Sequence, residues 1–281
     1  IELMEEHEPW RCFALAIEIE TGQILLMEGL PDYDSNNPLP SLTTKADPYS
    51  GEDKEFGWVN PAMWNFEPGS TMKPLVAAYA LERGDISEEQ RFERFGGKLY
   101  LPRRLRRDVI EDTGTMPPGD YRAFEGIVES SNIVFAQIAR TVGREGMADI
   151  LDFYGYHDKK FEMLGLDQPF MPRFSVSRAK IMRERGPDGM AYTVPTMGYG
   201  QGFDVPPIDH AMAIASIANG GTLLEATFNP NAEAKVRDQI FSADTSAYVR
   251  EAMLGMVKKE HRKWLPHRDE LDYCGKSGTA M

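Results

Sequence analysis

The chain has 281 residues, of which 42% are hydrophobic and 27% are charged, and its formal net charge is −13 at pH 7. This length and composition fit an ordinary globular protein with a core of normal size, in one large domain or two small ones. The acidic balance argues against a nucleic-acid partner, because binding to phosphates needs clustered cations.

The sequence shows neither a membrane span nor a leader. No apolar run approaches the roughly 18–20 residues of a membrane-spanning helix. The first residues are acidic, do not begin with Met, and lack the basic and apolar regions of a secretory signal. We therefore interpret the chain as an internal piece of a longer protein. For its two cysteines, Cys12 and Cys274, separate buried thiols are favoured over a single bridge.

The first predicted element is a β-hairpin. Two β-prone runs, residues 13–19 and 24–27, flank the turn residues Thr21 and Gly22. Residues 29–62 are rich in Asp, Asn, Ser and Pro, and this composition predicts a long surface loop.

A helix is predicted at residues 70–83. Ser70 is suited to the N-cap, Pro74 lies in the first turn where its missing N–H costs nothing, and Gly84 is a natural stop. Further helices are predicted at 122–129, 132–142, 207–219 and 243–259, and a short strand at 271–279. A strand hairpin, then mainly helices, then a strand predict an α/β (α+β) sandwich with an antiparallel sheet.

Three short motifs carry the chemistry: Ser70-Thr71-Met72-Lys73, Ser130-Ser131-Asn132 and Lys276-Ser277-Gly278-Thr279. Together they offer a serine nucleophile, a proton relay and an anchor for a carboxylate. Lone copies also occur at Ser177-Arg178-Ala179-Lys180 and Ser35-Asn36-Asn37, so one match alone means little. Only the first three stand in order and on suitable predicted elements, which favours a functional site.

The first motif has a physical logic of its own. Ser70 and Lys73 are three residues apart at a helix start, so their side chains share a face. A serine hydroxyl needs a base, and Lys73 can serve only if burial and a nearby positive charge such as Lys276 lower its pKa.

These residues resemble one protein family. Class B penicillin-binding proteins, the monofunctional D,D-transpeptidases of peptidoglycan synthesis, have an active-serine segment that resembles Phe66-Glu67-Pro68-Gly69-Ser70-Thr71-Met72-Lys73-Pro74. Their other motifs resemble Glu129-Ser130-Ser131-Asn132, Gly198-Tyr199-Gly200-Gln201-Gly202 and Gly275-Lys276-Ser277-Gly278-Thr279-Ala280. The resemblance spans about residues 12–281, and the Glu-Pro-Gly-Ser-Thr form leans towards the cell-division branch.

The resemblance implies a role for each site residue. Ser70 would attack the D-Ala-D-Ala carbonyl, Lys73 would accept its proton, and Ser130 would relay a proton to the leaving amine. Asn132 would bind the acyl-side amide, and the terminal carboxylate would be held by Lys276, Ser277 and Thr279. The backbone N–H groups of Ser70 and Thr279 would form the oxyanion hole.

The resemblance also implies a setting. The fold would be a three-layer sandwich of antiparallel sheet with a helical subdomain, and residues 1–281 would be a transpeptidase domain incomplete at both ends, without its C-terminal strands and helix. No metal or cofactor would be needed. Partners would be peptidoglycan stem peptides, β-lactams, a membrane glycosyltransferase and division proteins. The domain would lie in the bacterial envelope, outside the cytoplasmic membrane. It would be held there by a membrane anchor that is not present in this sequence.

Two kinds of alternative remain open. One is a related enzyme, a serine β-lactamase or a D,D-carboxypeptidase; the Glu-x-x-Leu-Asn loop of class A β-lactamases is not found in the sequence. The other is a non-enzyme, either a β-lactam sensor or a degenerate relative that only binds partners. We expect the isolated chain to be weakly active or inactive, because the Lys276 segment would lack neighbouring strands.

Other conspicuous residues have plainer interpretations. The basic run Arg103-Arg104-Leu105-Arg106-Arg107 is expected to be a solvated surface. His261 and His267 lack the further ligands that zinc needs. His210, near a predicted helix start, is expected to be structural.

Overall fold

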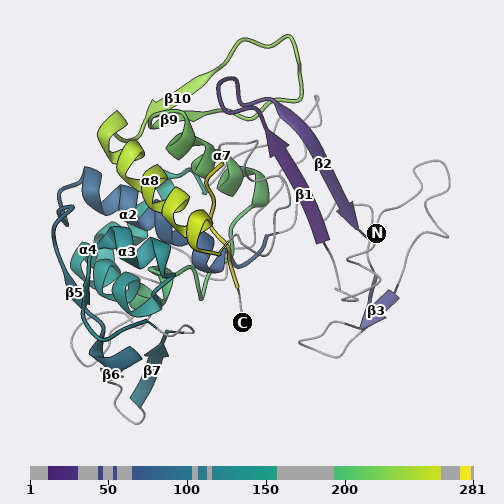
Figure 1. Cartoon of the computed structure of the whole chain (residues 1–281). Coiled ribbons are helices and arrows are strands. Elements are labelled where there is room, and N and C mark those ends of the chain that lie inside the picture. The colour runs from purple at the N-terminus through teal and green to yellow at the C-terminus, as the bar shows by residue number, and fades with distance from the viewer. Residues whose placement is uncertain are drawn as a thin grey trace.

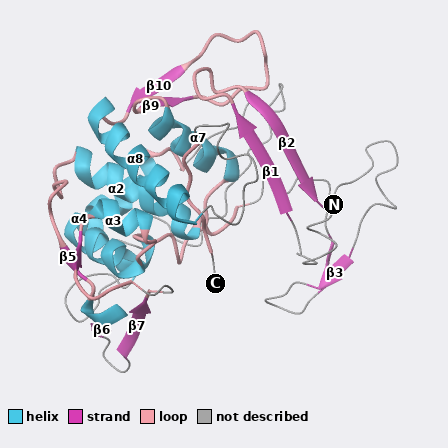
Figure 2. Cartoon of the chain, viewed as in Figure 1, coloured by secondary structure: helices cyan, strands magenta, loops and turns pink. Residues whose placement is uncertain are grey.

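The computed structural model describes eight stretches of the chain: 12–30, 44–46, 53–55, 65–102, 107–112, 116–156, 193–260 and 273–279. Helices gather into one body, and small antiparallel sheets lie around it (Figures 1 and 2). The predicted class, helices combined with antiparallel strands, is confirmed. The described strands pair in twos, and the ladders do not join into one wider sheet.

The N-terminal hairpin is confirmed. Strand β1 (Cys12–Ile17) pairs antiparallel with β2 (Ile24–Leu30), and Gly22 takes the left-handed backbone of the turn with φ of 76°. The hairpin is tied to the helical body, because Ile24 N donates to Thr227 O at 2.8 Å and β1 packs against α7 (Pro207–Ala218).

Part of the predicted loop at residues 29–62 has regular structure. Strand β3 (Thr44–Ala46) pairs antiparallel with β4 (Asp53–Glu55). Both segments are free of proline, so each can supply the backbone N–H groups that a short ladder needs.

The predicted helix at 70–83 begins differently. Residues Gly69–Met72 form a 3₁₀ turn, η3, and the α-helix α2 runs over Lys73–Glu82. Ser70 therefore lies inside the 3₁₀ turn, and its proposed N-cap role is wrong; Met72 holds the cap position without a side-chain bond. Pro74 in the first helical turn and Gly84 after the helix, with φ of 72°, are as predicted.

The other predicted helices are confirmed. They are α3 (Ala123–Val128), α4 (Asn132–Phe153), α7 and α8 (Ala243–Glu260), and a short α6 (Thr193–Met197) precedes α7. The expected end at residue 142 is a break: Gly143 has φ of 79° and ψ of 178°, and helical structure resumes beyond it.

Three small ladders complete the described strands. Strand β5 (Phe92–Glu93) pairs with β8 (Asp120–Tyr121), and the 3₁₀ turn η4 (Phe95–Gly97) leads into the next hairpin. That hairpin joins β6 (Lys98–Pro102) to β7 (Arg107–Glu111), while β9 (Thr222–Leu224) pairs with β10 (Val236–Gln239).

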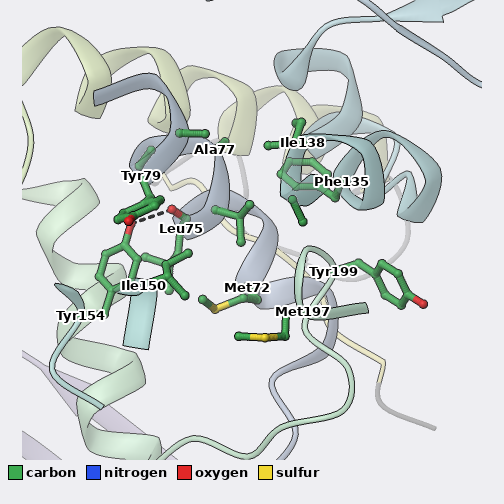
Figure 3. Packing of buried hydrophobic residues seen from close by; sticks show 14 of the residues in the cluster. Met72, Leu75, Ala77, Tyr79, Phe135, Ile138, Ile150, Tyr154, Met197 and Tyr199 are labelled. Carbon is green, nitrogen blue, oxygen red and sulfur yellow. Dashed lines mark hydrogen bonds between the residues drawn. The ribbon is translucent and has the colours of Figure 1, made fainter. Parts of the chain in front are cut away.

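Helix α2 lies at the centre of the core. It packs against α3, α4, α7 and α8, and every residue from Lys73 to Ala80 is buried. A helix that is apolar all round belongs inside a protein. Figure 3 shows its Leu75 and Tyr79 among the large side chains of α4, and the Tyr154 hydroxyl donates to Leu75 O at 2.6 Å. The first motif therefore leads directly into a helix whose first eight residues are all buried.

Three predictions have other outcomes. Residues 273–279 have no regular secondary structure, so the predicted strand is wrong over that range; a strand needs a ladder, and none of the described ladders includes it. Cys12 and Cys274 are free thiols, partly rather than fully buried. The Ser35 and Ser177 motif copies, residues 103–106, His261 and His267 lie outside the described residues.

Candidate active site

The first motif places the partly exposed Ser70 near the fully buried Lys73. Ser70 lies in η3, and Lys73 is the first residue of α2 with 0% of its surface exposed. The turn is fixed from one side by Gly69 N, which donates to Gly200 O at 2.9 Å. Because α2 is buried on all sides, the Lys73 ammonium has polar partners only where the fold supplies them.

The second motif supplies those partners. Ser131 caps α4, since its Oγ accepts from Val134 N at 3.1 Å, and Ser130 before it takes a left-handed backbone with φ of 56°. Such a backbone is costly for a residue with a side chain. It aims Ser130 at Lys73, whose Nζ donates to Ser130 O at 2.6 Å, to Asn132 Oδ1 at 2.8 Å and to Ser130 Oγ at 3.2 Å.

The third motif reaches the same point. Lys276 Nζ donates to Ser130 Oγ at 2.8 Å and to Ser277 O at 2.9 Å. The Ser130 hydroxyl thus lies between the Nζ atoms of two lysines, one from each of the other motifs. A proton passing between the motifs would have this hydroxyl on its way.

Two glycines let the first and third motifs touch. A Cβ on Gly69, whose φ is 52°, would lie 2.6 Å from Thr279 O, and a Cβ on Gly278 would lie 2.9 Å from Thr71 Cγ2. Neither distance leaves room for a side chain. The backbone of Thr279 therefore lies directly against the turn that carries Ser70, although residues 273–279 form no strand.

The surroundings of Lys73 favour its neutral form. Burial lowers the pKa of its ammonium well below the ordinary 10.5, the charge of Lys276 lowers this pKa further, and the charge of Asp112 opposes both. The hydrogen bonds of Lys73 Nζ within the described structure go to Ser130 and Asn132, and none goes to Ser70. Nucleophile and base often align only when substrate is bound, so this geometry is compatible with a base.

The structure thus gathers the sequence-predicted residues. Lys73, Ser130, Asn132 and Lys276 form one hydrogen-bonded cluster, and Ser70 is on the adjoining turn. Ser277 and Thr279 are exposed at its edge, where a ligand could reach them.

Sequence reasoning missed a buried ion pair beneath the second motif. Arg94 Nε donates to Asp112 Oδ2 at 2.9 Å, and these side chains are 8% and 2% exposed. Asp112 also accepts from Ser131 Oγ at 3.0 Å and from Ile133 N at 3.2 Å. Asp112 therefore holds the start of α4 and the strained Ser130 before it. No motif marks it, and no element was predicted around it.

We expect Asp112→Asn to destabilise the chain by about 3 kcal/mol, because one partner of a buried ion pair is lost and Arg94 stays buried. The measurement is urea unfolding. Lys98→Met is the matched control: it breaks the Lys98–Glu111 pair, whose side chains are both 54% exposed, and its midpoint should stay near that of the parent. Equal midpoints for the two variants would mean that the buried pair holds nothing in place.

The described residues hold no cluster of three or more His, Cys, Asp or Glu side chains suited to a metal ion. Among the helices that the structure describes, none is long and apolar enough to cross a membrane.

Three such motifs that meet at the Ser130 hydroxyl are the pattern of penicillin-binding proteins and serine β-lactamases. A family model described as the penicillin binding protein transpeptidase domain matches residues 12–281. The chain therefore belongs to the transpeptidase-domain family of penicillin-binding proteins, and its relatives place it in class B, as the motifs indicated.

Curated relatives agree at low identity. The "Probable peptidoglycan D,D-transpeptidase PenA" of Neisseria meningitidis is 26% identical over 99% of this chain and 42% of its own length. "Penicillin-binding protein 3" of Bacillus subtilis is 23% identical over 95% of this chain and 39% of its own length. The chain thus spans about two fifths of the length of these relatives.

Solved structures support the fold. A peptidoglycan glycosyltransferase from Burkholderia ambifaria superposes with a TM-score of 0.68 at 22% identity, over 91% of this chain and 69% of that one. The transpeptidase domain of Burkholderia pseudomallei penicillin-binding protein 3 gives a TM-score of 0.64 at 22% identity, over 91% of this chain and 65% of that one.

Proposed function

We propose that this chain is the catalytic part of a serine D,D-transpeptidase that crosslinks peptidoglycan stem peptides and is acylated by β-lactams. The observation that carries the proposal is the cluster in which Lys73 and Lys276 both donate to Ser130 Oγ, next to the turn of Ser70. Family membership and relatives named as D,D-transpeptidases support it.

The first half of the reaction forms an acyl-enzyme. Ser70 Oγ attacks the carbonyl carbon of the D-Ala-D-Ala peptide bond and gives its proton to neutral Lys73. The peptide bond then breaks, and the proton that Lys73 accepted passes through Ser130 to the leaving D-Ala amine, so that Lys73 is neutral again. The backbone N–H groups of Ser70 and Thr279 hold the oxyanion, and their proposed pairing is supported by the contact between Gly69 and the Thr279 backbone.

The second half transfers the acyl group. An amine of another stem peptide attacks the ester carbonyl, loses its proton to Lys73 and releases Ser70 with its hydroxyl restored. Lys276, Ser277 and Thr279 hold the terminal carboxylate of the donor peptide by charge and hydrogen bonds, and Asn132 binds the acyl-side amide. No step needs a metal or cofactor.

The rest of the protein's setting is part of the same proposal. The proposed site of action is the bacterial cell envelope, outside the cytoplasmic membrane, and relatives named as peptidoglycan D,D-transpeptidases support it. A membrane glycosyltransferase and division proteins are the proposed partners, and the division branch rests on the Glu67-Pro68-Gly69-Ser70-Thr71 form.

The test is labelling of the chain with a fluorescent penicillin, followed by intact mass and peptide mapping. Because weak activity is expected of the isolated chain, we expect the adduct to form slowly; it should reach one per chain at most, lie on the peptide with Ser70, and persist for minutes or longer. Turnover within seconds would instead identify a β-lactamase, and a D,D-carboxypeptidase would release D-Ala without forming a crosslink when an acceptor amine is supplied. A chain that binds penicillin without an adduct would be a partner-binding relative.

A further inference from the structure

A buried chain of hydrogen bonds ends at the nucleophile turn and takes no part in the proposed chemistry. His210 on α7 is 6% exposed; its Nε2 lies 2.9 Å from Thr71 Oγ1, and its Nδ1 lies 2.9 Å from the hydroxyl of Tyr156, which is 1% exposed. Thr71 directly follows Ser70. The imidazole thus connects a helix of the core to the turn that carries the nucleophile.

The donor and the acceptor of each of these hydrogen bonds follow from counting protons. Thr71 Oγ1 lies 2.6 Å from Pro68 O, and a carbonyl has no proton, so the single hydroxyl proton of Thr71 must point there. Thr71 Oγ1 therefore accepts from His210, whose Nε2 must carry a proton. Burial lowers the pKa of His210 to about 4, so the ring is neutral at pH 7 and its Nδ1 accepts from Tyr156.

These hydrogen bonds matter because Thr71 lies against the third motif. The Thr71 methyl group faces the third motif, where a Cβ on Gly278 would lie 2.9 Å from Thr71 Cγ2. On the other side of Ser70, Gly69 N is held by Gly200 O. Gly200 thus fixes one end of the turn, and the bond from His210 fixes the other end together with the contact surface for Gly278.

We propose that His210, oriented by Tyr156, is a positioning residue for the nucleophile: its Nε2–H, donated to Thr71 Oγ1, fixes the turn of Ser70 against the third motif. The proposal deepens the proposed function and rests on it. The hydrogen bonds of the buried His210 ring go to Thr71 and Tyr156, so its loss should slow the acylation step and leave the first, noncovalent binding of penicillin little changed.

Two amide variants of the full chain separate this role from general stability. His210→Gln places an N–H near the former Nε2 and keeps the donor to Thr71, whereas the shorter side chain of His210→Asn reaches only the Tyr156 side. We expect the acylation rate constant to fall about 10- to 100-fold in His210→Asn and to stay within about threefold of the parent in His210→Gln. The dissociation constant of the noncovalent complex should change less than about twofold in both.

Both variants disturb the same buried site, so their thermal midpoints should fall by similar amounts. Equal acylation rates in His210→Gln and His210→Asn would overturn the proposal. So would a loss of penicillin affinity with an unchanged acylation step.

A second measurement works on the parent and does not depend on acylation. Imidazole ¹⁵N spectra should show His210 protonated at Nε2 and bare at Nδ1. Thr71→Val should move the Nε2 resonance, and Tyr156→Phe the Nδ1 resonance. Tyr154→Phe, which alters a neighbouring buried hydroxyl bonded to Leu75 O, is the control and should move neither.

The acylation kinetics and the imidazole spectra test the two proposals independently. A parent that penicillin does not acylate, but whose spectrum shows the Nε2–H tautomer and responds to Thr71→Val, overturns the proposed function and leaves the contact standing. A proton on Nδ1, or a spectrum indifferent to Thr71→Val, overturns the positioning role whatever penicillin does.

Discussion

Ser70→Ala should abolish the covalent penicillin adduct completely, because the variant has no oxygen with which to form the ester. The loss should reach at least the roughly 10⁶-fold seen when other serine enzymes lose their nucleophile. Noncovalent binding should survive, since Lys276 and the edge residues Ser277 and Thr279 are untouched. The measurement is gel fluorescence and intact mass after exposure to labelled penicillin.

The control for Ser70→Ala is Ser87→Ala, which removes an exposed hydroxyl from the turn after α2. Its adduct should form at the parent rate. If Ser70→Ala still formed an adduct, peptide mapping would show which hydroxyl carries it. An adduct on Ser130 would make that residue the nucleophile and reverse the roles assigned to the first two motifs.

The sequence was enough to predict which residues gather, because the expected chemistry depends on a few residue types at short spacings. Ser70 and Lys73 are neighbours on one turn wherever the helix starts, so the wrong cap assignment for Ser70 did no harm. Likewise, Ser130 and Asn132 were correctly placed at a junction of two helices. The motif order then identified which three segments must converge.

The residues that sequence reasoning missed or undervalued act through tertiary contacts. Asp112 lies 19 residues from Ser131, which it holds, and His210 lies 139 residues from Thr71. No local periodicity connects such partners. His210 was expected to be structural, and its bond to Thr71 is visible only once α7 and η3 are packed together.

The strand predicted at 271–279 is wrong over residues 273–279, and the cause is related. A strand exists only through its neighbours, and the local sequence of this segment says nothing of them. The Lys276 segment nevertheless reaches Ser130, because glycines at 69 and 278 allow direct backbone contact with the first motif. The expectation that the isolated chain is weakly active or inactive stays a prediction.

The second large effect is expected for Lys73. Replacing it with Met should slow acylation by about 10²- to 10⁴-fold, the usual contribution of a positioned base. Lys73→Arg should lose as much, because a guanidinium stays protonated. In the parent, acylation should rise with pH through the lowered pKa of Lys73 and then level off, since only the neutral amine accepts a proton.

Lys276 provides a check on the cause of this pKa. Its charge lowers the pKa of Lys73, so Lys276→Met should raise that pKa and move the acid limb of the acylation profile to higher pH. Weaker penicillin binding is expected in the same variant, because the carboxylate loses its anchor. A profile that kept its acid limb in place would mean that another group limits the rate.

The same lysine should leave a signature in folding. Between its lowered folded pKa and the ordinary 10.5, Lys73 binds a proton in the unfolded chain and not in the folded one. The free energy of unfolding must therefore rise with pH across that window, and Lys73→Met should remove that part of the rise. Urea titrations at several pH values measure this rise. An unchanged pH slope in Lys73→Met would show that the pKa of Lys73 does not differ between the folded and the unfolded chain. If Lys73→Met loses both this pH dependence and acylation, the burial that makes Lys73 a base also lowers the free energy of unfolding wherever the unfolded chain would bind the proton.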